Sequence, residues 1–454
     1  TTNGNPQVGS MNLDVDYTGP ERALNLESRR IYELPYRFLS PSKVLIAGAG
    51  AGNETEVALR AGAARVTAVE LDPVFVELGR KLSPHRPFTD PRVTVRVDDA
   101  RAFFQNTTEK YDLVVIGFLD SQYRLAHLSN LRTENFVYTY ESLARTRDLL
   151  AEGGILQLNY NAARSDMRAK LYEMLRDIYG AKLAVYVPTD PVSANISFVA
   201  GPGVGKFDRP VPGLSRAVIE TGEGGDGGKL SVRWPTDDWP FLYLEKKMIP
   251  REYWTMLAVV PLISLFLITV IGRGGWRRDG SGVLGGFSPK FFLLGAGFML
   301  LETKSITSFA LIFGSTIDVV SVVLASILSA ILVSNLVIHR FGLKGLTAPY
   351  ILTVSTIAVL YFVPLGPFVT LHGTAKLAAS SVVIAAPIFF SAMVFGVSFS
   401  RSTRIDADFG SNIFGAVVGG MSEYFSMATG FSALYILSMA AYLAAFALER
   451  RRAG

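Results

Sequence analysis

A glycine-rich turn behind a buried strand constrains this chain more than any other feature. Residues 43–53 read KVLIAGAGAGN, and the apolar segment 65–70 ends in the acid Glu70. Glycines let a backbone approach a ligand closely, and a carboxylate at the next strand end can bind two ribose hydroxyls. Because Asn53 stands where a dinucleotide site has a third glycine or alanine, the spacing favours an S-adenosyl nucleoside. The glycines of this turn are Gly48, Gly50 and Gly52.

Strand and helix patterns alternate from this turn to about residue 200. This alternation predicts a Rossmann-like α/β domain over residues 41–245, with a parallel sheet covered on both faces and a Gly/Pro-rich linker at 201–230. Residues 1–40 contain an Asn-Gly turn signal, and we predict a small β-hairpin cap there. Helices are predicted at 54–61, 73–81 and 139–150. Strands are predicted at 43–47, 65–70, 93–97, 112–117, 154–159, 183–188 and 196–200.

The second part of the chain differs in charge and hydropathy. Residues 1–245 carry 28 basic and 31 acidic side chains, whereas residues 246–454 carry 16 and 8. The basic surplus accompanies apolar runs long enough to cross a bilayer, so it indicates membrane-flanking charge and no nucleic-acid partner. We predict an all-α transmembrane domain over 246–454 with about seven helices. The runs lie at 253–272, 291–313, 317–338, 347–365, 377–399, 410–428 and 431–447.

Cysteine is absent and the four histidines are scattered, which predicts neither a disulfide nor a metal site. The chain starts at Thr1 without an initiator methionine or a signal peptide. We therefore expect a piece or a processed form of a longer protein.

Acids follow the third and fourth predicted strands. Asp99 is the candidate acceptor for the exocyclic amine of adenine. The alternative for Asp99 is a solvated loop acid or the N-cap of the helix that follows, and Asp98 is the candidate for that cap. Ligands in open α/β sheets lie beyond the carboxyl ends of the strands, which places residues 117–122 beside the reactive end of a bound nucleoside. Asp120 is the carboxylate of that segment and the candidate catalytic residue. The alternative for Asp120 is a turn-forming role.

These segments together resemble the polyamine aminopropyltransferases, the spermidine synthases. The resemblance covers about residues 1–165 and is carried by VLIAGAGAGN, AVELDP, DDARAFF, YDLVVIGFLD and YTYESLARTRDLLAEGGIL. It implies a class I S-adenosylmethionine-dependent transferase fold that binds S-adenosylmethionine or its decarboxylated form. The pocket residues it implies are Gly48, Gly50, Gly52, Glu70, Asp99, Ala100 and Gln7. The second half, with FMLLE and EYFS, resembles the membrane part of bacterial proteins that fuse such a domain to transmembrane helices.

Departures from that family weaken the prediction of spermidine synthesis. The family turn resembles GGGDG, and Ala51 stands at the position of its acid. The family loop D-x-x-D-P aligns with Gly117, Asp120 and Ser121, so the first acid and the proline are missing. Because a buried diamine needs several carboxylates, we expect methyl or other alkyl transfer to a small-molecule or lipid acceptor. The alternatives are aminopropyl transfer, and a transporter or scaffold with a catalytically degenerate nucleoside-binding domain.

Further polar residues are candidate substrate contacts. Tyr32 lies in the part that resembles the family, and Asp237 and Asp238 precede the first apolar run beside three aromatic residues. The two acids either close over the site or lie in a headgroup-level loop next to an interfacial aromatic belt, and we favour the second interpretation.

Charged residues inside the apolar runs are expensive and face a partner or a cavity. The ones that stand out are Glu302, Lys304 and Glu423. A Lys304–Glu423 interhelical pair and a substrate path are equally compatible with them. The predicted partners are the lipid bilayer and the acceptor, and a homo-oligomer or membrane complex is left open.

Orientation is set by two conflicting arguments. With seven spans, four Lys/Arg residues flank the transferase side and eleven flank the other, which would put the domain outside the cytoplasm. S-adenosylmethionine is a cytoplasmic metabolite, however, and a nucleoside pocket should face its supply. We predict an integral protein of a bacterial inner membrane with its transferase domain in the cytoplasm.

Overall fold

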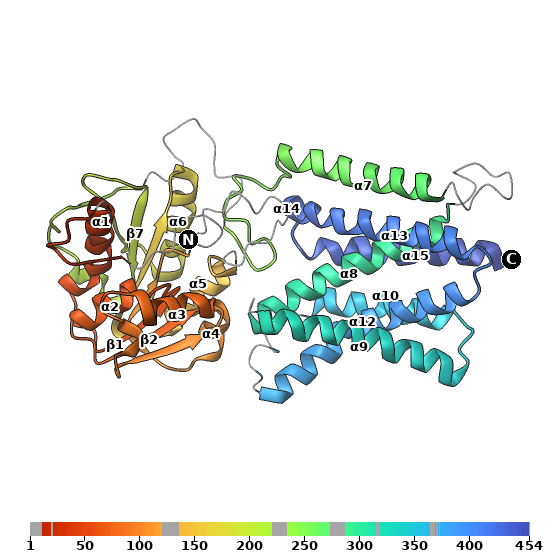
Figure 1. The fold of residues 1–454 in the computed structure, drawn as a ribbon, viewed down its shortest axis with the longest axis horizontal. Helices are drawn as coiled ribbons and strands as arrows, with labels where there is room; N and C mark the ends of the chain where they lie inside the picture. Colours follow the sequence, from red (N-terminus) through yellow and green to blue (C-terminus); the bar gives the residue numbers. More distant parts are fainter. Residues whose placement is uncertain are drawn as a thin grey trace. The chain divides into compact units, whose positions relative to one another are not determined.

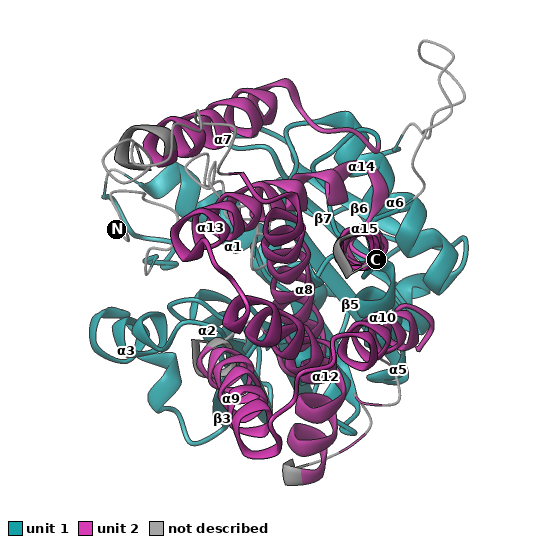
Figure 2. Ribbon diagram, turned by 90° about the vertical axis from the view of Figure 1, so that its right-hand side faces the viewer, with its two compact units in different colours: residues 1–246 teal, residues 247–454 magenta. Residues whose placement is uncertain are grey.

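The computed structural model describes residues 11–19, 21–119, 136–219, 234–272, 287–314, 317–363, 368, 371 and 373–453. The chain divides into two compact units, residues 1–246 and residues 247–454, coloured teal and magenta in Figure 2.

The regular elements in the described part of residues 11–40 are helices. Helix α1 spans Arg22–Glu33, and the 3-10 helix η1 spans Pro35–Arg37. The prediction of β structure is therefore wrong for these elements, whereas residues 1–10 lie outside the described part. The sequence of α1 contains no glycine or proline, and its buried side includes Ser28, Ile31 and Tyr32, at helical spacing. The Asn-Gly signal on which the β prediction rested lies near residue 4, outside these helices.

The first unit is built on an eight-stranded sheet in the order β3-β2-β1-β4-β5-β7-β6-β8. Strands β1 to β5 are parallel to one another, as predicted. The other three strands join in antiparallel pairs, so the prediction of a wholly parallel sheet is wrong at this edge. The strands are β1 (Lys43–Ala47), β2 (Arg65–Glu70), β3 (Val93–Val97), β4 (Tyr111–Ile116), β5 (Leu150–Asn161), β6 (Ala184–Pro188), β7 (Asn195–Ala200) and β8 (Leu214–Arg216).

Helices cover both faces of the sheet (Figure 1). Side chains alternate along a strand, so Leu45 and Ala47 of β1 join one apolar cluster while Val44 and Ile46 join the other. The first cluster includes residues of α4, α5 and α6, and the second includes residues of α1, α2 and α3. The helices are α2 (Asn53–Arg60), α3 (Pro73–Leu82), α4 (Ala100–Asn106), α5 (Tyr140–Asp148) and α6 (Ser165–Tyr179).

The strand order creates a switch point beside β1. Strand β1 pairs with β2 on one side and with β4 on the other, so the chain runs outward to β3 and then returns across β1. In open α/β sheets ligands bind at such a point, outside the carboxyl ends of the strands. The loops after β1 and β4 therefore border the candidate site.

The second unit is helical throughout its described part. Five of its helices are long and apolar enough to cross a membrane, and α10 and α13 are shorter, with 16 and 17 residues. The predicted runs at 347–365 and 410–428 correspond to these two. The helices are α7 (Arg251–Gly272), α8 (Pro289–Phe313), α9 (Ile317–Phe341), α10 (Thr347–Phe362), α12 (Gly373–Ser400), α13 (Ile405–Met421), η7 (Ser422–Phe425), α14 (Ser426–Thr429) and α15 (Ala433–Ala453).

Helices α8 and α13 approach each other backbone to backbone. A Cβ atom at Gly415 would lie 1.9 Å from the Phe292 carbonyl oxygen, and one at Gly419 would lie 2.5 Å from the Ala296 carbonyl oxygen. Small residues permit this close packing between helices. Helix α8 is also tied to α15, because the Lys290 ammonium lies 2.9 Å from a Glu449 carboxylate oxygen.

Candidate nucleoside and acceptor site

The turn after β1 is built from three glycines in the left-handed region of φ. Gly48, Gly50 and Gly52 have φ values of 76°, 54° and 96°, a conformation that other residues adopt at a cost. The Gly48 and Ala49 amides both donate to the Val69 carbonyl oxygen, at 2.9 and 3.0 Å, which fixes the turn against β2. The turn thus forms a shaped backbone surface at the switch point.

Glu70 ends β2 directly beside this turn. Its Oε2 accepts from the Gly50 amide at 2.7 Å and its Oε1 accepts from the Asp72 amide at 3.0 Å. Burial raises the pKa of Glu70 above its usual value, and these two amide bonds act in the opposite direction. The structure therefore places Glu70 at the glycine turn, and its predicted role as the ribose ligand stays a prediction.

Asp99 and Ala100 lie at the start of α4, beyond the carboxyl end of β3. The Asp99 carboxylate accepts from the Ala102 amide at 3.0 Å and caps the helix, so the assignment of the cap to Asp98 is wrong by one residue. Asp98 instead accepts from the Asp99 amide at 2.8 Å. A carboxylate accepts several hydrogen bonds, so capping does not preclude the predicted contact between Asp99 and adenine.

A buried acid that the sequence reasoning missed lies next to Gly117. Glu54 is 8% exposed, and its Oε2 lies 2.4 Å from the point that a Cβ atom at Gly117 would occupy. Glycine at position 117 therefore leaves room for a carboxylate from another element. Burial raises the pKa of Glu54 to about 7. Its position directly after the glycine turn, in the first turn of α2, is the signal that could have identified it.

Hydrogen bonds fix the orientation of Glu54. Asn159 of β5 donates from Nδ2 to Glu54 Oε1 at 2.9 Å, and the Ser197 hydroxyl donates to Asn159 Oδ1 at 2.8 Å. The buried Gln157 amide in turn donates to the Ser197 oxygen at 3.1 Å. This chain of bonds runs across β5 and β7 and holds one carboxylate oxygen of Glu54 in place.

Tyr32 is brought to the same end of the sheet by α1. Its ring meets Phe118 edge to face, with ring centroids 6.1 Å apart. Burial, followed by the nearby Glu54 carboxylate, raises the pKa of Tyr32 far above its usual value. The candidate substrate contact Tyr32 thus lies with Glu54 and the segment after β4. Gln7, Asp120 and Ser121 lie outside the described residues.

The segment around Asp237 belongs to the first unit and packs against other elements of that unit. The Asp237 carboxylate lies 2.5 Å from the Arg101 guanidinium and accepts from the Thr139 hydroxyl at 2.8 Å. Trp239 and Phe241 are 2% and 3% exposed. The favoured interpretation as an interfacial aromatic belt is therefore wrong. A substrate contact by Asp237 or Asp238 stays a prediction, and Asp237 has a structural partner in Arg101.

The charged residues predicted inside the apolar runs belong to the second unit. Lys304 of α8 is 6% exposed, and its ammonium lies 5.9 and 5.5 Å from the ring centroids of Phe431 and Tyr435. Glu302 lies on the same helix, and Glu423 lies in η7. The Lys304–Glu423 pair stays a prediction.

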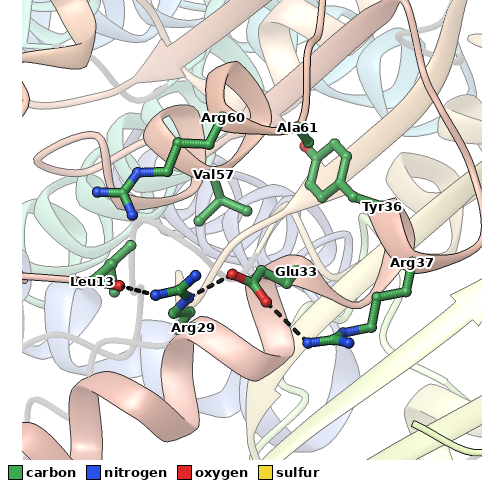
Figure 3. Close-up of a pocket in the computed structure, with 8 residues that line it drawn as sticks. All are labelled: Leu13, Arg29, Glu33, Tyr36, Arg37, Val57, Arg60 and Ala61. Atoms are coloured by element: carbon green, nitrogen blue, oxygen red, sulfur yellow. Dashed lines mark hydrogen bonds and ion pairs between the residues drawn. The ribbon is translucent and has the colours of Figure 1, made fainter. Parts of the chain in front are cut away.

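A separate pocket of about 380 Å³ lies between α1 and α2. Figure 3 shows Glu33 of this pocket between Arg29 and Arg37, with which it forms ion pairs of 2.5 and 3.1 Å. Arg60 lines the opposite side and pairs with Asp14 and Glu56. The glycine turn does not line this pocket.

Known proteins match the first unit. A family model of the spermine/spermidine synthase domain matches residues 25–179. The polyamine aminopropyltransferase of Korarchaeum cryptofilum is 29% identical over 33% of this chain and 46% of its own length. That of Nitrosomonas europaea is 31% identical over 31% of this chain and 42% of its own length. The chain thus spans less than half the length of these relatives.

Solved structures also align with this unit. The spermidine synthase of Thermotoga maritima aligns with a TM-score of 0.32 and 20% identity, covering 39% of this chain and 60% of that one. A SAM-dependent methyltransferase of Agrobacterium tumefaciens aligns with a TM-score of 0.29 and 15% identity, covering 41% and 63%.

The strand order and the glycine turn at its switch point define a Rossmann-like domain of the S-adenosyl transferase class. Within it, residues 25–179 are similar to the spermine/spermidine synthase domain. A helical region with several apolar helices follows it.

Proposed function

We propose that this chain is a membrane-embedded transferase that uses S-adenosylmethionine or its decarboxylated form for methyl or other alkyl transfer. The observation that carries the proposal is the turn of three positive-φ glycines closed by Glu70 at the switch point of the sheet. Gly48 has a φ of 76°, so the backbone shape of the turn depends on glycine there. The residues present fit a nucleoside.

Each part of the site has a distinct task in this proposal. The glycine turn and Glu70 hold the ribose, and Asp99 with Ala100 holds the adenine at the start of α4. The donor supplies an activated carbon on a positively charged sulfur. Gly117 and Phe118 follow β4, at the edge where an acceptor would meet that carbon.

The apolar helices support a membrane location. Five described helices are long and apolar enough to cross a bilayer. We infer that the acceptor is a small molecule or a lipid that reaches the domain at the membrane.

Aminopropyl transfer is the second candidate. Glu54 supports it because its carboxylate borders the space at Gly117, where the sequence had indicated a missing acid. The matched relatives are named polyamine aminopropyltransferases. With Gly117 in place of the family acid, we still expect little transfer to putrescine. Robust spermidine formation from putrescine and decarboxylated S-adenosylmethionine would favour this candidate over methyl transfer.

Calorimetry on the purified full chain tests the donor site. The probes are S-adenosylmethionine, its decarboxylated form and methylthioadenosine. We expect Glu70→Ala to abolish binding in a folded protein, because two charge-assisted hydrogen bonds of about 1.5–3 kcal/mol each are lost. Glu77→Ala is the control, since Glu77 is exposed on α3 and pairs with Lys81 of the same helix. Undiminished affinity in Glu70→Ala would disprove the pocket assignment, and no binding of any probe would disprove the donor site itself.

A further inference from the structure

We propose that Glu54 is the general base of this site and that the acceptor is a protonated amine, an inference that rests on the proposed transferase function. Glu54 is not the acid that the sequence pattern marks. Its assignment comes from its position at the carboxyl edge of the central strands.

Residues at the carboxyl ends of three parallel strands surround the Glu54 carboxylate. Gly48 follows β1, Gly117 follows β4, and Asn159 lies near the end of β5. A Cβ atom at Gly117 would lie 2.4 Å from Glu54 Oε2 and 3.0 Å from the Gly48 carbonyl oxygen. Glu54 Oε2 therefore lies against Gly117, in a position that a side chain at residue 117 would not permit. The acid lies at the edge of the sheet where ligands of this fold bind.

The two oxygens of Glu54 are set up differently. Oε1 accepts from Asn159, which is held by Ser197, whereas Oε2 faces Gly117. A carboxylate fixed at one oxygen can present the other to a substrate in a defined direction. A buried ammonium requires such a partner, because an unpaired charge is costly in an apolar environment.

The chemistry follows from this arrangement. An ammonium acceptor transfers a proton to Glu54 Oε2 and becomes a neutral amine. The nitrogen lone pair then forms a bond to the donor carbon, while the carbon–sulfur bond breaks and its electron pair stays on sulfur as a neutral thioether. The product nitrogen carries the positive charge, and Glu54 later returns its proton to solvent.

Among the groups that face one another here, Glu54 is the one that titrates near pH 7. Tyr32 of α1 and Tyr36 of η1 interact with it, and burial followed by the Glu54 charge raises the pKa of both phenols, so they stay neutral near pH 7. The neighbours from the strands are Gly48, Gly117 and Asn159, none of which titrates. Burial raises the pKa of Glu54 to about 7, which suits a general base at neutral pH.

Amine binding to the full chain in detergent tests the assignment without turnover. The probes are n-butylamine and putrescine, titrated calorimetrically between pH 5.5 and 8.5. We expect affinity to rise about 30-fold over this range as Glu54 ionises. Glu54→Gln keeps an acceptor for Asn159 and should bind weakly with no pH dependence. Glu56→Gln is the control, because Glu56 lies on the same helix but pairs with Arg60.

Turnover gives a second test, measured as thioether release from the donor with each amine. We expect Glu54→Gln to lose about 10²-fold in kcat/KM while donor affinity is unchanged. Gly117→Asp alone should be inactive because its side chain collides with Glu54, and Glu54→Ala with Gly117→Asp should recover part of the activity.

The outcomes separate the two proposals. Donor binding that is absent in the wild type overturns the proposed function. If the donor binds normally, the assignment of Glu54 is overturned by either of two results. In the first, Glu54→Gln keeps wild-type amine affinity, pH dependence or turnover. In the second, no amine is alkylated.

Discussion

Gly117 shows that a small residue can define a site by the space it leaves. In the sequence comparison, Gly117 stands where the resembled family has an acid. In the fold, the absence of a side chain at Gly117 makes room for the Glu54 carboxylate. The two positions are therefore complementary, and a side chain at 117 and an acid at 54 exclude each other sterically. Substitutions at either position should be judged as a pair.

We predict that Glu54→Gln makes the protein more heat-stable at pH 8 but not at pH 5. Burial raises the pKa of Glu54 from 4.5 to about 7, so its contribution to stability is fully present below pH 4.5 and lost as the pH rises through about 7. The gain at pH 8 is up to about 3 kcal/mol. Thermal unfolding of the full chain in detergent measures it, with the exposed Glu77→Gln as control. Equal differences at both pH values would contradict the prediction.

Local spacing made part of the site predictable. The glycine turn and Glu70 lie on two consecutive strands, and the structure brings them together through the Gly50 amide. Glu54 escaped because its role depends on Asn159, 105 residues away, and on the missing side chain at Gly117. The N-cap was misassigned by one residue because Asp98 and Asp99 are both capable of capping.

At the scale of elements, the main wrong prediction concerned residues 234–245, which were interpreted as an interfacial aromatic belt. Its aromatic residues precede an apolar run, which is also typical of a membrane interface. In the structure Trp239 and Phe241 are buried, and buried Lys170 of α6 donates to the Leu242 carbonyl oxygen at 3.4 Å. Contacts with α4, α5 and α6 determine where this segment lies, and its own sequence does not reveal these contacts.

We predict that Asp237→Ala destabilises the protein by about 3–5 kcal/mol, because it leaves the buried Arg101 guanidinium without its carboxylate. Thermal unfolding in detergent measures the loss. The double variant Arg101→Met with Asp237→Leu removes both charges and should be less destabilised than Asp237→Ala. A double variant that is equally unstable would show that the charge pair is not the cause.

A second prediction at this scale follows from the contact between α8 and α13. Gly415→Ala should destabilise the helical unit by about 1–3 kcal/mol, since the new methyl group would lie 1.9 Å from the Phe292 carbonyl oxygen. Gly420→Ala is the matched control on the same helix, because its Cβ atom would lie 3.8 Å from Met299. Unfolding temperatures measured in detergent should separate the two variants. Identical values would show that the helices yield without cost.

At the scale of the molecule, the alternation of strands and helices predicted the parallel part of the sheet. The antiparallel edge was missed although a signal was present. Strands β6 and β7 are separated by residues 189–194 only, and a parallel connection needs a dozen residues or more. The short connection therefore requires β6 and β7 to pair in opposite directions.

Orientation remains a prediction of the whole chain. We expect the first unit to face the cytoplasm, where S-adenosylmethionine is made, against the excess of Lys/Arg on the opposite side. Reporter fusions at the two ends of the 253–272 run measure this. A reporter active only outside the cytoplasm, fused on the domain side, would overturn the prediction and with it a cytoplasmic supply of the donor.

The order of elements along the chain also has a consequence for synthesis. The last strand of the sheet ends at Arg216, and the first long apolar helix begins at Arg251. At about 5–20 residues per second, a ribosome takes about 2–7 seconds to make the residues between them. Strands of the sheet thus have time to bury one another before α7 emerges, so the nascent chain need not expose both sets of apolar segments at once.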